Sequence, residues 1–143
     1  MKSTKITYWI CTGLFCAMMT LAGCLYLAGS PQALAIFAHL GYPPYFPSLL
    51  GTAKLLGVVV LLIPGARLLK EWAYAGFTIT CISAFVSHLA SNDGPKALPA
   101  LVALGLLVVS YFTRPADRAV PAAHPNVPTR DMGLMPPPRP AHG

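Results

Sequence analysis

Long apolar blocks separated by short polar turns are the feature that most constrains this chain. Hydrophobic residues make up 55% of its 143 residues and charged residues only 10%, and the mean hydropathy is +0.61. A soluble domain carries about 25% charged residues, because a short chain exposes much of its surface to water. Ten lysines and arginines with four acids cannot cover such a surface. We therefore expect lipid to surround most of the chain.

Four of these blocks are long enough to cross a bilayer. A span needs about 20 mostly apolar residues, and lipid offers its backbone no hydrogen-bond partner, so each span must be helical. Pro, Gly and other turn-forming residues lie between the blocks. The sequence predicts an all-α integral membrane four-helix bundle, with helices at about 8–28, 47–64, 72–90 and 97–113. A short amphipathic helix at 32–39 is expected between the first two.

The composition changes at Arg114. Residues 114–143 contain eight prolines and few apolar residues that could build a core. Such a composition is typical of disordered segments. We expect residues 1–113 to form the membrane domain and residues 114–143 to form a disordered proline-rich tail.

The distribution of basic residues predicts an orientation. The N-terminus, the second link and the tail carry eight lysines and arginines, whereas the first and third links carry only Lys96. The positive-inside rule therefore places both termini in the cytoplasm. No basic face forms, so the net charge of +6 does not indicate nucleic acid binding.

The first block has a competing interpretation. Leu21-Ala22-Gly23-Cys24 fits a lipoprotein cleavage site, preceded by Lys2, Lys5 and an apolar stretch. Cleavage would leave three spans and would put the Arg-rich tail on the outer side, against the charge rule. The four-span interpretation is therefore preferred.

The motifs of common enzymes and metal sites are missing from the sequence. There is no CxxC pair, no Cys/His pair at zinc spacing and no paired His motif for haem. There is also no glycine-rich phosphate loop, nucleophile elbow or carboxylate pair for acid–base chemistry. We expect no catalytic residues, no metal site, no intrinsic cofactor and no enzyme activity of the chain alone.

Lys54 is the one charged residue inside a predicted span. A charge at a helix centre costs about 2.5–3.5 kcal/mol on insertion scales, so it needs a reason. Gly51 and Gly57 share its helix face, and small residues let a neighbouring helix approach closely. This pattern predicts that Lys54 faces the bundle and binds a ligand. The alternative is that its ammonium snorkels to the outer headgroups.

Other polar residues are predicted at the same outer end. His88 lies near the end of the third span, where it could move a proton or hydrogen-bond a ligand, or serve only structure. His39, Tyr42 and Asp93 belong to the outer links. Together with Lys54, these four residues form the candidate ligand-binding site.

Several motifs resemble the DoxX-like family, in the right order and at the right helix ends. The resemblance runs from about Tyr8 to Pro115 and leaves out the tail. The motifs are Gly41-Tyr42-Pro43, Gly51-Thr52-Ala53-Lys54-Leu55-Leu56-Gly57, Leu62-Ile63-Pro64-Gly65, Lys70-Glu71-Trp72-Ala73-Tyr74-Ala75-Gly76-Phe77 and Ser87-His88.

The resemblance implies a four-helix, multi-pass protein of the bacterial inner (plasma) membrane. The wider DoxX superfamily takes its name from a subunit associated with thiosulfate:quinone oxidoreduction. We therefore expect a non-catalytic accessory subunit that binds a quinone or similar amphiphile near Lys54 and His88 for a membrane redox enzyme partner. One alternative is a small-solute transporter or pore, which would need a homo-oligomer because four short helices enclose little lumen. Another is a structural or assembly protein without a ligand.

Overall fold

The computed structural model describes residues 2–121, and the predicted tail beyond them lies outside the described residues. The helices are α1 (Lys2–Leu27), α2 (Pro31–His39), α3 (Phe46–Leu62), α4 (Arg67–Ala90) and α5 (Gly94–Thr113), followed by a short 3-10 turn at Ala116–Arg118. No strand occurs in residues 2–121, so the all-α prediction is confirmed.

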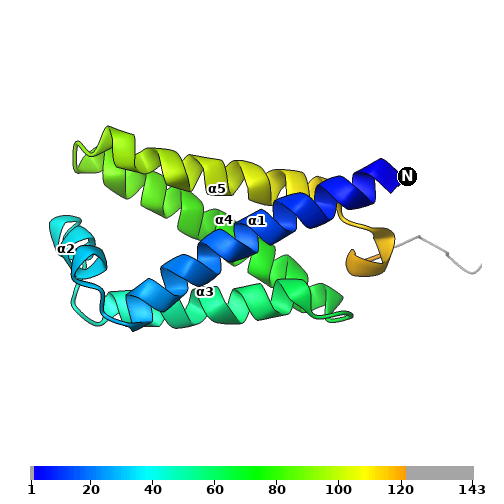
Figure 1. Ribbon diagram of the computed structural model, residues 1–143, viewed down its shortest axis with the longest axis horizontal. Helices are drawn as coiled ribbons and strands as arrows, with labels where there is room; N and C mark the ends of the chain where they lie inside the picture. Colours follow the sequence, from blue (N-terminus) through cyan, green and yellow to red (C-terminus); the bar gives the residue numbers. More distant parts are fainter. Residues whose placement is uncertain (1, 122–143) are drawn as a thin grey trace, which may run out of the picture.

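Four long helices pack side by side, and α2 lies across one end (Figure 1). α1 packs against α3 and α5, and α4 packs against α5 and α3, which closes a ring in the order α1–α3–α4–α5. α2 rests on α3 and α1. Residues 2–121 therefore form five α-helices, of which the short α2 corresponds to the predicted amphipathic link. The N-terminus and the turn at Ala116–Arg118 lie at the opposite end.

The long helices present apolar surfaces that suit lipid. Three of them, α1, α4 and α5, are long and apolar enough to cross a membrane. α3 has 17 residues and spans about 25 Å, near the lower limit for a crossing. Large apolar side chains such as Ile79 and Phe112 face outward, which would be costly in water.

Three helices begin at least three residues earlier than the hydropathy predicted. α1 begins at Lys2 rather than near residue 8, α4 at Arg67 rather than near residue 72, and α5 at Gly94 rather than near residue 97. Hydropathy marks where the apolar part of a helix starts, whereas helical hydrogen bonding continues through the basic residues that precede it.

The core combines aromatic packing with a buried hydroxyl network. Phe15 of α1 and Phe77 of α4 meet edge to face, with ring centroids 5.0 Å apart. The Ser110 hydroxyl of α5 lies 2.6 Å from the Thr12 hydroxyl of α1 and 2.8 Å from the Tyr74 hydroxyl of α4. All three hydroxyls are therefore satisfied without water, and they join three helices of the ring.

The crossing of α1 and α3 depends on two glycines. A Cβ atom added at Gly51 would lie 2.9 Å from the Gly23 carbonyl oxygen, and one at Gly23 would lie 3.1 Å from the Gly51 carbonyl oxygen. The two backbones are thus in direct contact, in the manner of small-residue packing between membrane helices. This contact determines how the face of α3 that carries Lys54 is presented to α1.

Lys70 stabilises the carboxyl end of α3. Its side chain is 1% exposed, and its Nζ donates to the carbonyl oxygens of Val60 (2.8 Å), Leu61 and Ile63. A helix leaves its last carbonyls unpaired, so a buried ammonium that donates to them satisfies both groups.

Residues 114–121 of the predicted tail lie within the described residues and contact the helices. Arg114 pairs with Glu71 at 2.6 Å and lies 4.1 Å from the Tyr111 ring centroid. Arg118 lies 4.6 Å from the Trp9 ring centroid and donates to the Leu61 carbonyl oxygen. One ion pair, several cation–π contacts and two hydrogen bonds thus join Arg114, Asp117 and Arg118 to the helices. The disorder predicted for residues 114–143 stays a prediction.

The partner of Glu71 comes from a distant part of the sequence. Arg67 and Lys70 are the basic residues nearest to it along the chain. Lys70 instead turns inward to α3, and Arg67 donates to the Asp117 carbonyl oxygen at 3.0 Å. Glu71 pairs with Arg114 because the chain returns to this end of the ring after α5.

Candidate functional site

Lys54 is buried between α3, α1 and α4. Its residue is 7% exposed, and its Nζ donates to the Met19 sulfur at 3.2 Å and lies 5.9 Å from the Tyr26 ring centroid. A thioether is a weak acceptor, and an ammonium has three donors. Within residues 2–121, no carboxylate lies within ion-pair distance of this ammonium. The predicted inward orientation is confirmed, and the ammonium still has donors to offer a ligand.

One cavity of about 190 Å³ lies beside Lys54, between α2, α3 and α4. We call it the α2-side cavity. Most of its wall is apolar, and its polar groups come from Lys54, Tyr26, Tyr42 and four residues of α4. The lining residues are Tyr26, Ile36, Phe37, Leu40, Tyr42, Phe46, Leu50, Lys54, Ile79, Thr80, Ser83, Ala84, Ser87 and His88.

A second cavity of about 180 Å³ lies between α1, α4 and α5. We call it the α5-side cavity. It shares five wall residues with the first, so Lys54 and His88 stand between the two. Its lining residues are Met18, Met19, Ala22, Tyr26, Lys54, Thr80, Cys81, Ala84, His88, Lys96, Pro99, Ala100 and Ala103.

His88 offers a second polar group at this junction. Its Nδ1 atom is buried and has no hydrogen-bond partner among residues 2–121. A neutral imidazole has one donor and one acceptor nitrogen, and buried polar atoms are nearly always paired. The unpaired nitrogen and the lysine ammonium line the same two cavities.

Aromatic side chains close the α2-side cavity at the end of the ring. Tyr42 stacks on Phe46 with ring centroids 4.5 Å apart, and its hydroxyl lies 2.9 Å from the Ser87 hydroxyl. Phe37 of α2 meets Tyr26 edge to face at 5.0 Å. Because α2 carries one of these rings, its position determines how closed the end of the cavity is.

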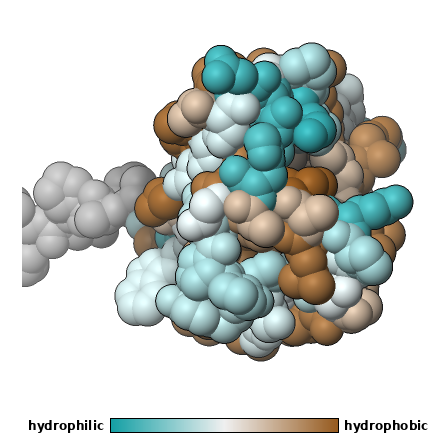
Figure 2. All heavy atoms as spheres, turned by 90° about the vertical axis from the view of Figure 1, so that its left-hand side faces the viewer, coloured by the Kyte–Doolittle hydropathy of each residue, from teal (hydrophilic) through white to brown (hydrophobic). Residues whose placement is uncertain are grey.

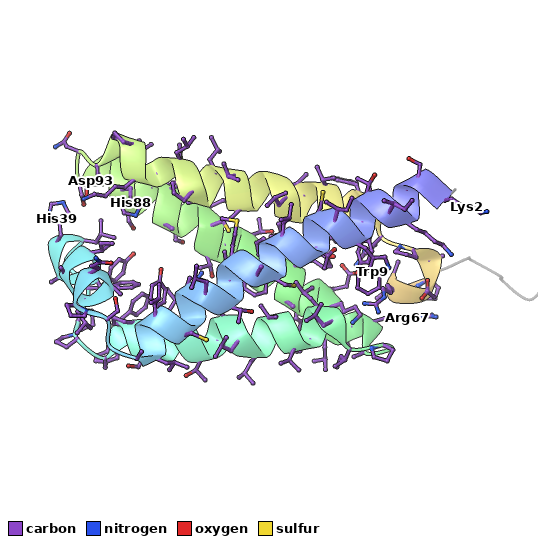
Figure 3. The ribbon with its side chains drawn as sticks, viewed as in Figure 1. Lys2, Trp9, His39, Arg67, His88 and Asp93 are labelled. Carbon is purple, nitrogen blue, oxygen red and sulfur yellow. The ribbon has the colours of Figure 1, made fainter. Side chains whose placement is uncertain are left out.

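His39 and Asp93 come together but do not line either cavity. The His39 Nε2 atom lies 3.1 Å from the Asp93 carboxylate, which Lys96 also approaches at 3.3 Å (Figure 3). The pair links α2 to the turn between α4 and α5. Figure 2 shows this end face on, with hydrophilic residues across its upper and central parts. The five residues of the candidate site thus fall into two groups. Lys54, His88 and Tyr42 line the α2-side cavity. His39 and Asp93 pair with each other outside it and connect α2 to the turn between α4 and α5.

Sequence reasoning missed two contributors. Met19 provides the sulfur that accepts from Lys54, and nothing in an apolar run distinguishes one such Met from another. The ring of Tyr26 also lies beside Lys54, although Tyr26 was not among the residues selected from the sequence. The polar residues of α4 did carry a signal, since Thr80, Ser83 and Ser87 recur at helical spacing, a pattern typical of hydrogen bonding between membrane helices. Ser87 hydrogen-bonds to Tyr42, whereas Thr80 bonds to the Gly76 carbonyl oxygen of its own helix.

Within the described residues, no group of three or more His, Cys, Asp and Glu side chains could hold a metal ion. The four cysteines are unpaired thiols, and Cys16 and Cys81 are buried in the core. The polar chemistry of the site therefore comes from an ammonium, an imidazole and hydroxyls, which suit a ligand that accepts hydrogen bonds.

Comparison with known protein families shows to which family the chain belongs. The profile of the DoxX-like family matches residues 10–110, which includes Lys54, His88 and all four long helices in whole or in part. The chain belongs to the DoxX-like family. No curated protein and no solved structure matched it. Family membership and the apolar helices together identify a membrane protein, and they leave its ligand and partners open.

Proposed function

We propose that this DoxX-like protein binds a membrane-dissolved amphiphile, a quinone or a chemically similar molecule, with its headgroup against Lys54 and His88. In this proposal the protein is an accessory subunit that presents the amphiphile to a redox enzyme in the bacterial inner membrane. In this proposal the partner enzyme, and not this chain, supplies the electron transfer. Both termini face the cytoplasm, where the eight basic residues of the N-terminus, second link and tail lie.

The buried ammonium of Lys54 is the main observation that supports the proposal. A charge held away from water is costly unless a partner compensates it, and the Met19 sulfur is a poor partner. A quinone carbonyl accepts hydrogen bonds and donates none, so it complements a site that presents an ammonium. His88 could then donate to a second oxygen or accept from a hydroxyl of the reduced form.

The position of the α2-side cavity favours a ligand that arrives through lipid. α3 and α4 lie close near their connecting turn and diverge toward the end that holds α2 (Figure 1). Where they diverge, the cavity wall includes Ile79 and Ser83 of α4, whose side chains are also exposed on the outer surface. A headgroup could thus enter from the bilayer between the two helices while an apolar tail stays in lipid.

The size of the cavity limits what it can hold. Drug-sized ligands occupy sites of about 300–1,000 Å³, and this cavity of about 190 Å³ is smaller. It therefore suits a single headgroup ring rather than a whole amphiphile. The aromatic rings of Tyr42 and Phe46 could pack against the faces or edges of such a ring.

The experiment compares the small molecules that the protein carries out of the membrane. Wild type, Lys54→Met and Lys5→Met are purified in native-membrane nanodiscs, and their extracts are compared by mass spectrometry. Lys5 is exposed at the opposite end of the ring, so its variant controls for loss of one positive charge. We expect an amphiphile enriched in wild type and Lys5→Met and depleted in Lys54→Met.

Identical extracts that contain only bulk lipid would contradict the proposal and favour a structural role. Lys54-dependent solute flux in liposomes, without an enriched amphiphile, would favour the transporter alternative instead.

A further inference from the structure

The structure assigns a second binding site, for a small anionic group, to the α5-side cavity. This inference goes beyond the proposed function: it shares Lys54 with the amphiphile site but does not require an amphiphile. The anionic group is an inorganic oxyanion or the phosphate of a lipid headgroup, because both present the same acceptor oxygens.

The charges around this cavity are of one sign. Lys54 and Lys96 line it together with His88, and no Asp or Glu is among its lining residues. Asp93 approaches Lys96 at 3.3 Å from the turn between α4 and α5, and does not line the cavity. Lys54 has no carboxylate partner in residues 2–121. An anion in this cavity would supply the missing counter-charge, and a cation would be repelled.

The two lysines differ in exposure, so one marks the outer end of the cavity and the other its inner end. The side chain of Lys96 is 57% exposed, whereas Lys54 is 7% exposed. Pro99 also lines the cavity and is exposed near the start of α5. The cavity therefore leads from a charged mouth at the α4–α5 end of the ring to a buried charge, an arrangement that attracts anions from the surface.

The volume and the wall chemistry specify the size of the ligand. A water molecule takes about 30 Å³ in the liquid, so about 180 Å³ accommodates a group of a few heavy atoms. Apart from the hydroxyls of Tyr26 and Thr80 and the thiol of Cys81, the rest of the wall is apolar. The Thr80 hydroxyl already donates to the Gly76 carbonyl oxygen. The affinity for an oxyanion would therefore come mainly from the two ammonium groups and His88, with the Tyr26 hydroxyl as a further donor.

The experiment measures thermal unfolding of the full-length protein in nanodiscs of zwitterionic lipid, titrated with inorganic phosphate at constant ionic strength. We expect the wild-type midpoint to rise saturably with phosphate, because a ligand that binds only the folded state stabilises it. Lys54→Met should show no such rise. Lys96→Gln should need roughly three- to fivefold more phosphate, since an exposed charge contributes less than a buried one. Lys5→Met, at the far end of the ring, should titrate like wild type.

The Lys96→Gln variant keeps the inference testable if Lys54→Met does not fold. An unchanged phosphate titration in Lys96→Gln would overturn the inference, as would a rise that persists in a folded Lys54→Met. If free phosphate has no effect on wild type, the same variants are compared in nanodiscs with and without an anionic phospholipid. Stabilisation by that lipid that depends on Lys54 and Lys96 would identify the headgroup as the source of the anion. Absence of stabilisation by either source would overturn the site.

The same samples distinguish this inference from the proposed function. Lys96 lines only the α5-side cavity, so Lys96→Gln should leave the amphiphile content unchanged. Phosphate binding without an amphiphile would refute the proposed function alone, and an amphiphile without an anion effect would refute the second site alone.

Discussion

The substitution Gly51→Ala should weaken the packing of α1 against α3. The new Cβ would lie 2.9 Å from the Gly23 carbonyl oxygen, 3.1 Å from Tyr26 Cβ and 3.2 Å from Leu27 Cγ. The first two of these atoms belong to the backbone or sit next to it, so they cannot move aside without moving the helix. The two helices would have to separate by a few tenths of an ångström.

The magnitude follows from two opposing contributions. Overpacking a tight contact costs about 1–3 kcal/mol. Replacing a helical Gly by Ala recovers at most about 0.5–1 kcal/mol. We therefore expect Gly51→Ala to lower the free energy of unfolding by about 1–2 kcal/mol. Gly13 of α1 has no heavy atom within 4 Å of its added Cβ, so Gly13→Ala should be neutral or slightly stabilising.

The assay is reversible unfolding in mixed micelles by increasing fractions of a denaturing detergent, followed by the fluorescence of Trp9 and Trp72. Comparing Gly51→Ala with Gly13→Ala removes the common effect of adding a methyl group to a helix. If the Gly51 variant were as stable as the Gly13 variant, the close crossing of α1 and α3 would be refuted.

Three further predictions use the same assay. Ser110→Ala removes the hydroxyl between Thr12 and Tyr74 and should cost about 1 kcal/mol; a neutral result would mean that water replaces it. Lys70→Met leaves the last α3 carbonyls without their donor and should lower the free energy of unfolding by about 2–3 kcal/mol. A loss smaller than that of Ser110→Ala would refute the capping role of Lys70. Asp93→Asn breaks a partly exposed pair with His39 and should cost less than about 1 kcal/mol, so a larger loss would show that this contact governs the fold.

The helices could be predicted from the sequence because hydropathy and turn residues act locally. An apolar block that must satisfy its own backbone in lipid has one available structure, the helix. The placement of Lys54 could also be predicted, because Gly51 and Gly57 marked the helix face where a neighbour approaches.

The contacts that join distant segments could not be predicted in this way. Lys70 reaches the carbonyls of α3 across the tight turn that joins the two helices, in which Ala66 adopts a left-handed conformation with φ of 44°. Arg114 and Arg118 meet aromatic rings of α1, α4 and α5, and their spacing in a proline-rich segment shows nothing of those partners. The division of the candidate site likewise depends on how α2 folds back, which brings His39 to Asp93 rather than to Lys54.

The most direct test of the account is an experimental density map of the chain in lipid nanodiscs, bound by an antibody fragment to aid alignment. The account predicts that the Lys54 ammonium lies between the α2-side and α5-side cavities, with density for a non-protein group within hydrogen-bonding distance of it. A Lys54 side chain that extends to the lipid headgroups, with both cavities empty or collapsed, would contradict it.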